Sequence, residues 1–194
     1  MRITTRDLAP GLWPAVEVLF GATGACGGCW CQAWRFERGE KWSAIKGACA
    51  KERLRSGILA GTVYGILAFD GEMPVGWCTF GPRLSFPRLA LARTLRCDDA
   101  ERAWSIPCFF VARGYRGKGV ATALLDHALK TMARSGVEIV EGYPTKPDDS
   151  GRYIASFAWT GTRSLFAKAG FVVVGNPGGS KQRVRKTLTI DRDP

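Results

Sequence analysis

The sequence lacks any apolar run that approaches the roughly 20 residues needed to span a membrane. Its first residues also lack the apolar core of a secretory signal, so we expect neither a membrane association nor export. Without export, the 7 cysteines are expected to be free thiols in the reducing cytoplasm. The only histidine, His127, falls off the apolar stripe of its predicted helix and is expected at the surface.

Acidic residues are also scarce, because 17 Asp and Glu stand against 28 Lys and Arg, which gives a formal net charge of +11. Such a charge fits an anionic partner, whether a nucleic acid, a membrane surface or a phosphate-rich cofactor. The basic residues are scattered, however, and the sequence has no recognition helix or stacking platform with interleaved cations. We therefore expect no nucleic-acid partner and keep a basic nucleic-acid-binding module as an alternative.

The chain has 194 residues, 46% of them hydrophobic, which is enough for one domain with a sizeable core. Apolar segments predict strands over residues 2–6, 62–69, 74–80, 104–111, 137–143, 171–174 and 183–190. Helices are predicted over 12–20, 89–95, 120–134 and 161–169, and the Gly-rich residues 21–28 are expected to form a loop. A meander followed by a strand–helix–strand unit predicts an α+β, α/β-like domain around one mixed sheet.

One segment carries recognisable chemistry, the loop Arg116-Gly117-Lys118-Gly119 between the buried strand 104–111 and the helix 120–134. Glycines let backbone N–H groups approach a ligand, and a helix N-terminus adds partial positive charge. Together they favour a site for phosphate or pyrophosphate. The loop has neither the glycine spacing of a dinucleotide fingerprint nor that of a Walker loop.

These residues resemble the GNAT acetyltransferase superfamily. Arg116-x-x-Gly119-x-Ala121 looks like its coenzyme A pyrophosphate motif, and the segment 165–171 resembles its last helix running into a Gly-Phe strand start. The resemblance covers about residues 57–188. It implies a mostly antiparallel sheet whose middle strands, 104–111 and 137–143, splay apart to admit acetyl-coenzyme A as co-substrate. The implied cofactor contacts are Phe109, Phe110, Val111, Arg116, Gly117, Lys118, Gly119, Val120 and Ala121.

The catalytic residues are harder to assign, because Phe166 stands where many members of the superfamily have a tyrosine acid. A phenyl ring cannot donate a proton, and Tyr143 and Tyr153 are the nearby substitutes. An amine acceptor must also lose a proton, for which Glu141 is the candidate base, directly or through water. We therefore predict Glu141 and Tyr143 as catalytic residues.

The segment Cys26-Gly27-Gly28-Cys29-Trp30-Cys31-Gln32-Ala33-Trp34 admits three interpretations. A soft-metal site would need a fourth ligand outside any second CxxC pair, so no metal is expected. A redox pair of Cys26 and Cys29 is the second. The third makes residues 1–56 the acceptor side of a single domain, with Trp30, Cys31 and Trp34 binding the substrate. Some uncharacterised members of the superfamily carry a similar Gly-Cys-Trp-Cys segment.

The favoured interpretation is an acetyl-coenzyme A-dependent N-acetyltransferase in which the amine of a small acceptor attacks the thioester directly. The sequence leaves the acceptor open between an amino sugar, a polyamine, an amino acid, an antibiotic and a peptide N-terminus, and it leaves a homodimer open. Besides the nucleic-acid-binding module, the cysteine segment and Phe166 motivate a second alternative, a metal or thiol sensor on a catalytically weak acyltransferase fold.

Overall fold

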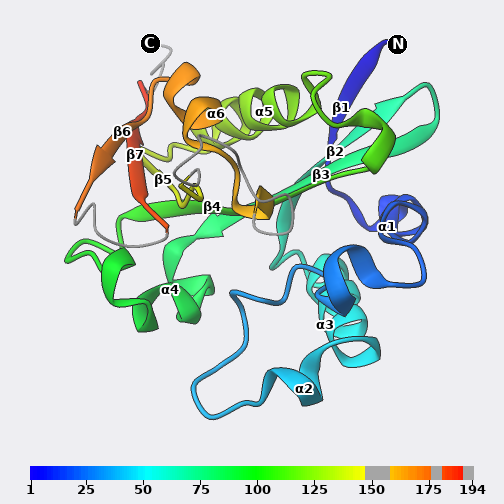
Figure 1. Cartoon of the computed structure of the whole chain (residues 1–194), viewed down its shortest axis with the longest axis horizontal. Helices are drawn as coiled ribbons and strands as arrows, with labels where there is room; N and C mark the ends of the chain where they lie inside the picture. Colours follow the sequence, from blue (N-terminus) through cyan, green and yellow to red (C-terminus); the bar gives the residue numbers. More distant parts are fainter. Residues whose placement is uncertain (147–157, 176–180, 190–194) are drawn as a thin grey trace.

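A seven-stranded sheet forms the centre of the computed structural model, which describes residues 1–146, 158–175 and 181–189 (Figure 1). The strand order is β1-β2-β3-β4-β5-β7-β6, and every neighbouring pair is antiparallel except β4 and β5. This confirms the predicted mixed, mostly antiparallel sheet. The strands are β1 (Ile3–Asp7), β2 (Tyr64–Asp70), β3 (Met73–Pro82), β4 (Ala103–Val111), β5 (Ile139–Gly142), β6 (Val172–Val174) and β7 (Arg183–Thr187).

The two parallel strands in the middle of the sheet diverge, as the resemblance implied. Their pairing runs from Ala103 beside Ile139 to Ile106 beside Gly142, and β5 then ends while β4 continues to Val111. Beyond Gly142 the ring of Phe166 packs against the diverging strand, so closely that a Cβ on Gly142 would lie 2.3 Å from its Cε1. Among the described residues, the far half of β4 is therefore paired only with β3, and its other edge faces the opening.

β4 also contains a bulge, which explains how a proline fits into a central strand. Thr79 pairs with Cys108 while Gly81 pairs with Ser105, so β4 has one more residue than β3 in this interval. Pro107 lies in that interval and has no N–H to donate. The bulge tolerates this missing donor and bends the strand just before the residues that line the opening.

In the described parts of the chain, six α-helices flank the sheet: α1 (Trp13–Phe20), α2 (Trp42–Ile45), α3 (Ala48–Leu59), α4 (Pro87–Leu91), α5 (Val120–Arg134) and α6 (Arg163–Lys168). The predicted helix over 89–95 is shorter than expected, because α4 ends at Leu91 and a 3-10 turn covers Arg93–Leu95. The sequence did not reveal α3, whose buried side chains are a narrow stripe among charged residues: Ala50, Leu54 and Ile58. None of the described helices is long and apolar enough to cross a membrane.

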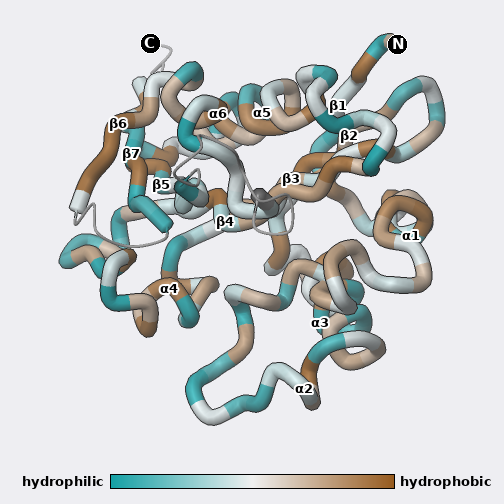
Figure 2. Tube along the Cα trace, in the orientation of Figure 1, coloured by the Kyte–Doolittle hydropathy of each residue, from teal (hydrophilic) through white to brown (hydrophobic). Residues whose placement is uncertain are grey.

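Two large apolar clusters lie on opposite faces of the sheet (Figure 2). The predicted stripe of α5, which includes Leu124, Ala128 and Met132, is buried in the first cluster against the sheet. The second cluster joins Val16, Trp30 and other N-terminal residues to the opposite face. The N-terminal segments therefore pack directly on the central strands, over the residues of β4 that line the opening.

Candidate active site

A groove lies where β4 ends and α5 begins. Gly117 and Gly119 adopt positive φ angles of 74° and 81°, and Gly119 is the N-cap residue of α5. Such angles are costly for residues that carry a Cβ, which explains the need for glycine at both positions. The Nε of Arg116 donates a hydrogen bond to the carbonyl of Val111 at 3.1 Å and ties the loop to the end of the strand.

The first turn of α5 presents backbone donors to this groove. No side chain of the described residues caps the helix, and the first helical hydrogen bond runs from the N–H of Ala123 to the carbonyl of Gly119 at 3.0 Å. The N–H groups of Val120, Ala121 and Thr122 therefore remain available at the positive end of the helix dipole. This arrangement is chemically suited to an anionic group such as a pyrophosphate.

The groove, about 810 Å³ in volume, runs from this helix terminus along the free edge of β4 to α6. Of the residues predicted to bind the cofactor, eight line it: Phe109, Phe110, Val111, Arg116, Gly117, Gly119, Val120 and Ala121. Lys118 is the exception, although its ammonium lies 5.6 Å from the centre of the ring of Tyr115, which does line the groove. Lys168 of α6 lines the groove as well, so that cations stand on both sides of it.

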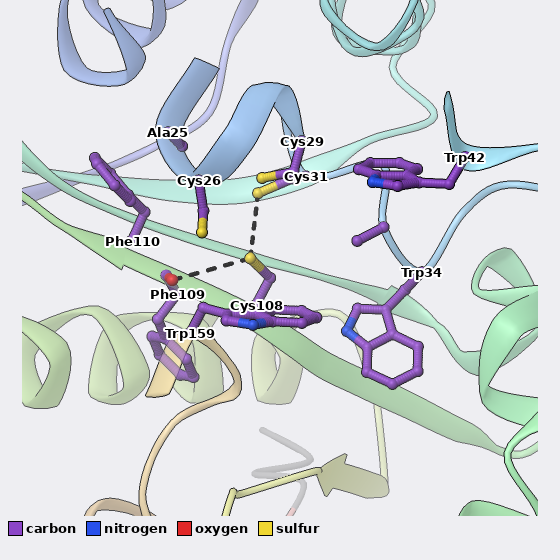
Figure 3. Close-up of a pocket in the computed structure, with 11 residues that line it drawn as sticks. Ala25, Cys26, Cys29, Cys31, Trp34, Trp42, Cys108, Phe109, Phe110 and Trp159 are labelled. Carbon is purple, nitrogen blue, oxygen red and sulfur yellow. Dashed lines mark hydrogen bonds between the residues drawn. The ribbon is translucent and has the colours of Figure 1, made fainter. Parts of the chain in front are cut away.

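A second cavity, of about 190 Å³, opens beside the groove; we call it the thiol pocket (Figure 3). Its walls carry four cysteines, three tryptophans and apolar side chains: Ala25, Cys26, Cys29, Cys31, Ala33, Trp34, Trp42, Cys108, Phe109, Phe110 and Trp159. Phe109, Phe110 and Trp159 also line the groove. Because the two cavities share these walls, a ligand in one would meet a ligand in the other at the free edge of β4.

The cysteine loop contributes to this pocket only in part. Of the three residues predicted to bind the substrate, Cys31 and Trp34 line the pocket and Trp30 does not. The Trp30 ring is buried 5.4 Å from that of Phe20, and a Cβ on Gly24 would lie 2.1 Å from its Nε1. The structure therefore corrects this prediction, because Trp30 belongs to the N-terminal core, and Trp159 supplies a wall that the sequence analysis missed.

Two of the four thiols that line the pocket, those of Cys29 and Cys31, lie in surroundings that favour the protonated form. Sγ of Cys31 lies 3.4 Å from Sγ of Cys108 and accepts a hydrogen bond from Nε1 of Trp77 at 2.9 Å. Burial raises the pKa of Cys31 well above its ordinary value and that of Cys29 to about 11. All 7 cysteines are free. Across the described residues no group of three or more His, Cys, Asp or Glu side chains is arranged to hold a metal ion.

Glu141, the predicted base, lies in a buried ion cluster instead of a cavity. Its side chain is fully buried and lines neither the groove nor the thiol pocket. Its Oε2 accepts a hydrogen bond from Arg83 at 2.7 Å, and its Oε1 accepts one from Arg183 and one from Arg185, each at 2.7 Å. Both oxygens are committed to guanidinium groups, so this geometry disfavours the predicted role of Glu141 as the base.

Tyr143, the predicted acid, belongs to the same cluster. Its hydroxyl donates to Oε2 of Glu141 at 3.1 Å, is 2.6 Å from Oγ of Ser105 and accepts a hydrogen bond from Arg83. Burial, and then the Glu141 charge, raise the pKa of this phenol. Since Tyr143 is fully buried and lines neither cavity, the geometry gives it a structural place in the cluster.

The arginines of this cluster were not singled out from the sequence, although a signal was present. Arg183 and Arg185 are two residues apart on β7, so their side chains share one face of the strand. Glu141 pairs in register with Arg185 on the neighbouring β5. If the pairing of β5 with β7 had been known, Glu141 beside Arg183 and Arg185 would have indicated an ion cluster.

Two further residues, Tyr153 and Lys181, could take part in proton transfer. Tyr153, the other substitute for the missing tyrosine, lies outside the described residues. Lys181, which the sequence analysis did not single out, lies 5.0 Å from the Trp159 ring and donates hydrogen bonds to Thr145 and Thr160. Burial lowers its pKa to about 8.

A sequence model of the acetyltransferase (GNAT) family matches residues 30–153 of this chain. This match begins at Trp30, within the cysteine segment, and spans β2 to β5 and the Arg116–Gly119 loop. Curated protein sequences gave no match to the chain.

Solved structures with the same fold cover almost the whole chain. A PaiA N-acetyltransferase from Thermoplasma acidophilum in complex with coenzyme A is 18% identical, with a TM-score of 0.57 over 97% of this chain and 100% of that one. A GCN5-related N-acetyltransferase from Kribbella flavida is 16% identical, with a TM-score of 0.57 over 96% and 98%. YncA from Salmonella typhimurium, with its cofactor acetyl-CoA, is 15% identical, with a TM-score of 0.54 over 99% and 97%.

Proposed function

Since the chain belongs to the acetyltransferase (GNAT) family, we propose that it is an N-acetyltransferase that uses acetyl-coenzyme A and acetylates the amino group of a small acceptor. The observation that carries this proposal is the continuity of two cavities at the free edge of β4. One cavity has the donors for an anionic cofactor, and the other is a separate enclosure for an acceptor.

The groove fits coenzyme A in its chemistry. The free N–H groups of Val120, Ala121 and Thr122, with Arg116 nearby, would hold the pyrophosphate. The unpaired edge of β4 at Phe109 to Val111 would hydrogen-bond an extended amide chain, as an added strand does. Solved relatives of this fold contain coenzyme A or acetyl-CoA, which supports the same assignment.

Acetyl-coenzyme A, when bound, supplies an activated acyl group with a thiolate leaving group. The protein's part would be to exclude water and to hold the amine against the free edge of β4. A backbone N–H near Val111 would polarise the acyl oxygen. Phe166 adds no proton donor. None is required, because the thiol of coenzyme A has an ordinary pKa of about 8.5 and leaves readily as the thiolate.

A substitution in the first turn of α5 tests the cofactor site. Ala121→Glu places a negative charge in the groove at a helical position without backbone strain, whereas Gly119 has a positive φ that would confound any substitution. We expect Ala121→Glu to weaken acetyl-coenzyme A binding about tenfold or more, measured by calorimetry, because like charges are brought together.

Ala123→Glu is the matched control, because Ala123 lies on the same helix but lines neither the groove nor the thiol pocket. It should bind acetyl-coenzyme A as the wild type does. Equal affinities in all three proteins would place the cofactor elsewhere, and a wild type that neither binds nor hydrolyses acetyl-coenzyme A would end the proposed function. The cytoplasmic location, the small amine acceptor and the homodimer stay predictions.

A further inference from the structure

We propose that the acceptor is a single-ring aromatic amine, with its amino group bonded to the ring and a carboxylate elsewhere on it. This inference rests on the proposed function and names the substrate class of the thiol pocket. Three independent features carry it: the size and lining of the pocket, the charges around it, and one unpaired donor in its wall.

The pocket has the size and surface for one aromatic ring. Its volume is about 190 Å³, and Trp34, Trp42 and Trp159 stand around it with the Phe110 ring (Figure 3). Apolar cavities of about 150 Å³ already hold benzene. The flat indole faces favour a planar ligand, because offset and edge-to-face ring contacts add to burial.

The charges around the pocket disfavour a cationic acceptor. No acidic side chain is present among the described residues that line it. Arg35 lies close enough to Cys31 and Cys108 to interact with them electrostatically, and Lys181 is similarly close to Cys108. Within the described ranges neither cation forms an ion pair with a carboxylate. A polyamine or an amino sugar would bring further positive charge without a counter-ion, whereas a carboxylate would gain two cations.

In the described part of the chain, no Asp, Glu or His side chain lines the pocket to accept a proton from the amine. Glu141 and Tyr143 lie outside it, and the raised pKa values of Cys29 and Cys31 keep those thiols protonated. An alkyl amine is an ammonium ion at neutral pH and must lose a proton before it can attack. An amine on an aromatic ring delocalises its lone pair into the ring and is already neutral, so it needs no base at this stage.

The bond changes balance with these groups alone. The neutral nitrogen forms a bond to the acetyl carbon, the carbon–sulfur bond breaks, and the electron pair leaves on the sulfur. The extra proton on nitrogen passes to water, and the thiolate of coenzyme A is the leaving group. Arg35 and Lys181 would lower the pKa of the bound amine further and so favour its neutral form.

An unpaired donor in the wall points to the carboxylate. Nε1 of Trp34 is buried and makes no hydrogen bond in the described part of the chain. Figure 3 shows this nitrogen on the side of the indole that is turned toward Trp159 and Cys108. A buried donor without a partner is costly, and a ligand oxygen would satisfy it.

An amine panel tests the substrate class, with 4-aminobenzoate, aniline, benzylamine, spermidine and glucosamine as probes. Release of coenzyme A and the mass of the acetylated product are measured. We expect kcat/KM for 4-aminobenzoate to exceed the values for spermidine and glucosamine at least about a hundredfold, because Arg35 and Lys181 near the pocket repel both. Benzylamine has the same ring size but a protonated amine, and it should also be poor. Equal or better turnover of benzylamine, spermidine or glucosamine overturns the inference.

Trp34→Phe separates the hydrogen bond from the ring. This variant removes the Nε1 donor and keeps an aromatic wall, so kcat/KM for 4-aminobenzoate should fall about tenfold or more. The value for aniline, which has no oxygen, should fall less than that for 4-aminobenzoate, because aniline loses only part of the ring contact. An equal loss for both probes overturns the role of the donor. If acetyl-coenzyme A binds and only another class of amine is acetylated, this inference fails while the proposed function stands.

Discussion

The guanidinium of Arg83 and the carboxylate of Glu141 lie 2.7 Å apart, on side chains that are 3% and 0% exposed. The two residues are 58 positions apart in the sequence, and their ion pair links the segment that follows β3 to β5. Burying two charges costs several kcal/mol each, and the geometry offsets that cost only because further donors saturate the carboxylate. Glu141 is therefore the centre of a buried network of ion pairs, and this position favours a structural role over that of a base.

Glu141→Gln should lower the free energy of unfolding, with any loss of turnover following from that loss of stability. The amide leaves Arg83, Arg183 and Arg185 without their shared negative charge, and we expect a loss of about 3 kcal/mol in the free energy of unfolding. Denaturant titration measures this loss. Asp99→Asn is the control, because Asp99 is a partly exposed partner of Arg185 and should cost less than about 1 kcal/mol. A stable Glu141→Gln enzyme whose turnover alone is lost would restore Glu141 as the base.

Asp99 should make the protein sensitive to acid. Hydrogen bonds from Arg185 lower the pKa of this carboxyl from 3.8 to about 2. Between these values the unfolded chain binds a proton that the folded chain does not, so stability present above pH 3.8 is lost as the pH falls toward 2. We expect the unfolding free energy of Asp99→Asn to depend less steeply on pH over this interval. Parallel curves for wild type and variant would contradict the assignment.

The buried thiols predict a loss of stability in alkali. Burial raises the pKa of Cys29 from 9.0 to about 11. The stability that the protonated Cys29 thiol contributes to the folded state is therefore complete below pH 9.0 and is lost as the pH rises through about 11. Cys29→Ala should therefore flatten the fall of the unfolding free energy over this range. Cys49→Ala is the matched control, since that thiol is exposed. If both variants follow the wild-type curve, the Cys29 environment is not the cause.

Phe166 is expected to act through packing alone. Its ring is fully buried, 6.0 Å from that of Phe109 and 5.0 Å from that of Phe171. Phe166→Ala should cost about 3–5 kcal/mol of stability, measured by denaturant unfolding. Phe166→Leu keeps most of the apolar volume and should recover most of both the stability and the turnover. Recovery of stability without turnover would reveal a role of the ring beyond packing.

The sequence alone determined the order of the strands and the helix N-terminus that borders the groove. Strong local signals carry both, since the apolar stripe of α5 and the glycines at 117 and 119 act within one strand–loop–helix unit. Local spacing was enough to predict that the loop ends in a helix N-terminus with free donors. The helix α3 was not predicted, because charged residues dominate its sequence and its narrow apolar stripe is buried only by the packed N-terminal core.

The tertiary structure decided what the remaining polar and aromatic residues do. Glu141, Arg83 and Arg185 come from three distant segments, so no spacing along the chain could show that they neutralise one another. Trp30 and Trp34 lie four positions apart in one loop, yet the positive φ angles of Trp30 and Cys31 turn the first ring into the core, while the second lines the pocket. Charge and side-chain direction depend on long-range contacts, and these exist only once the chain has folded.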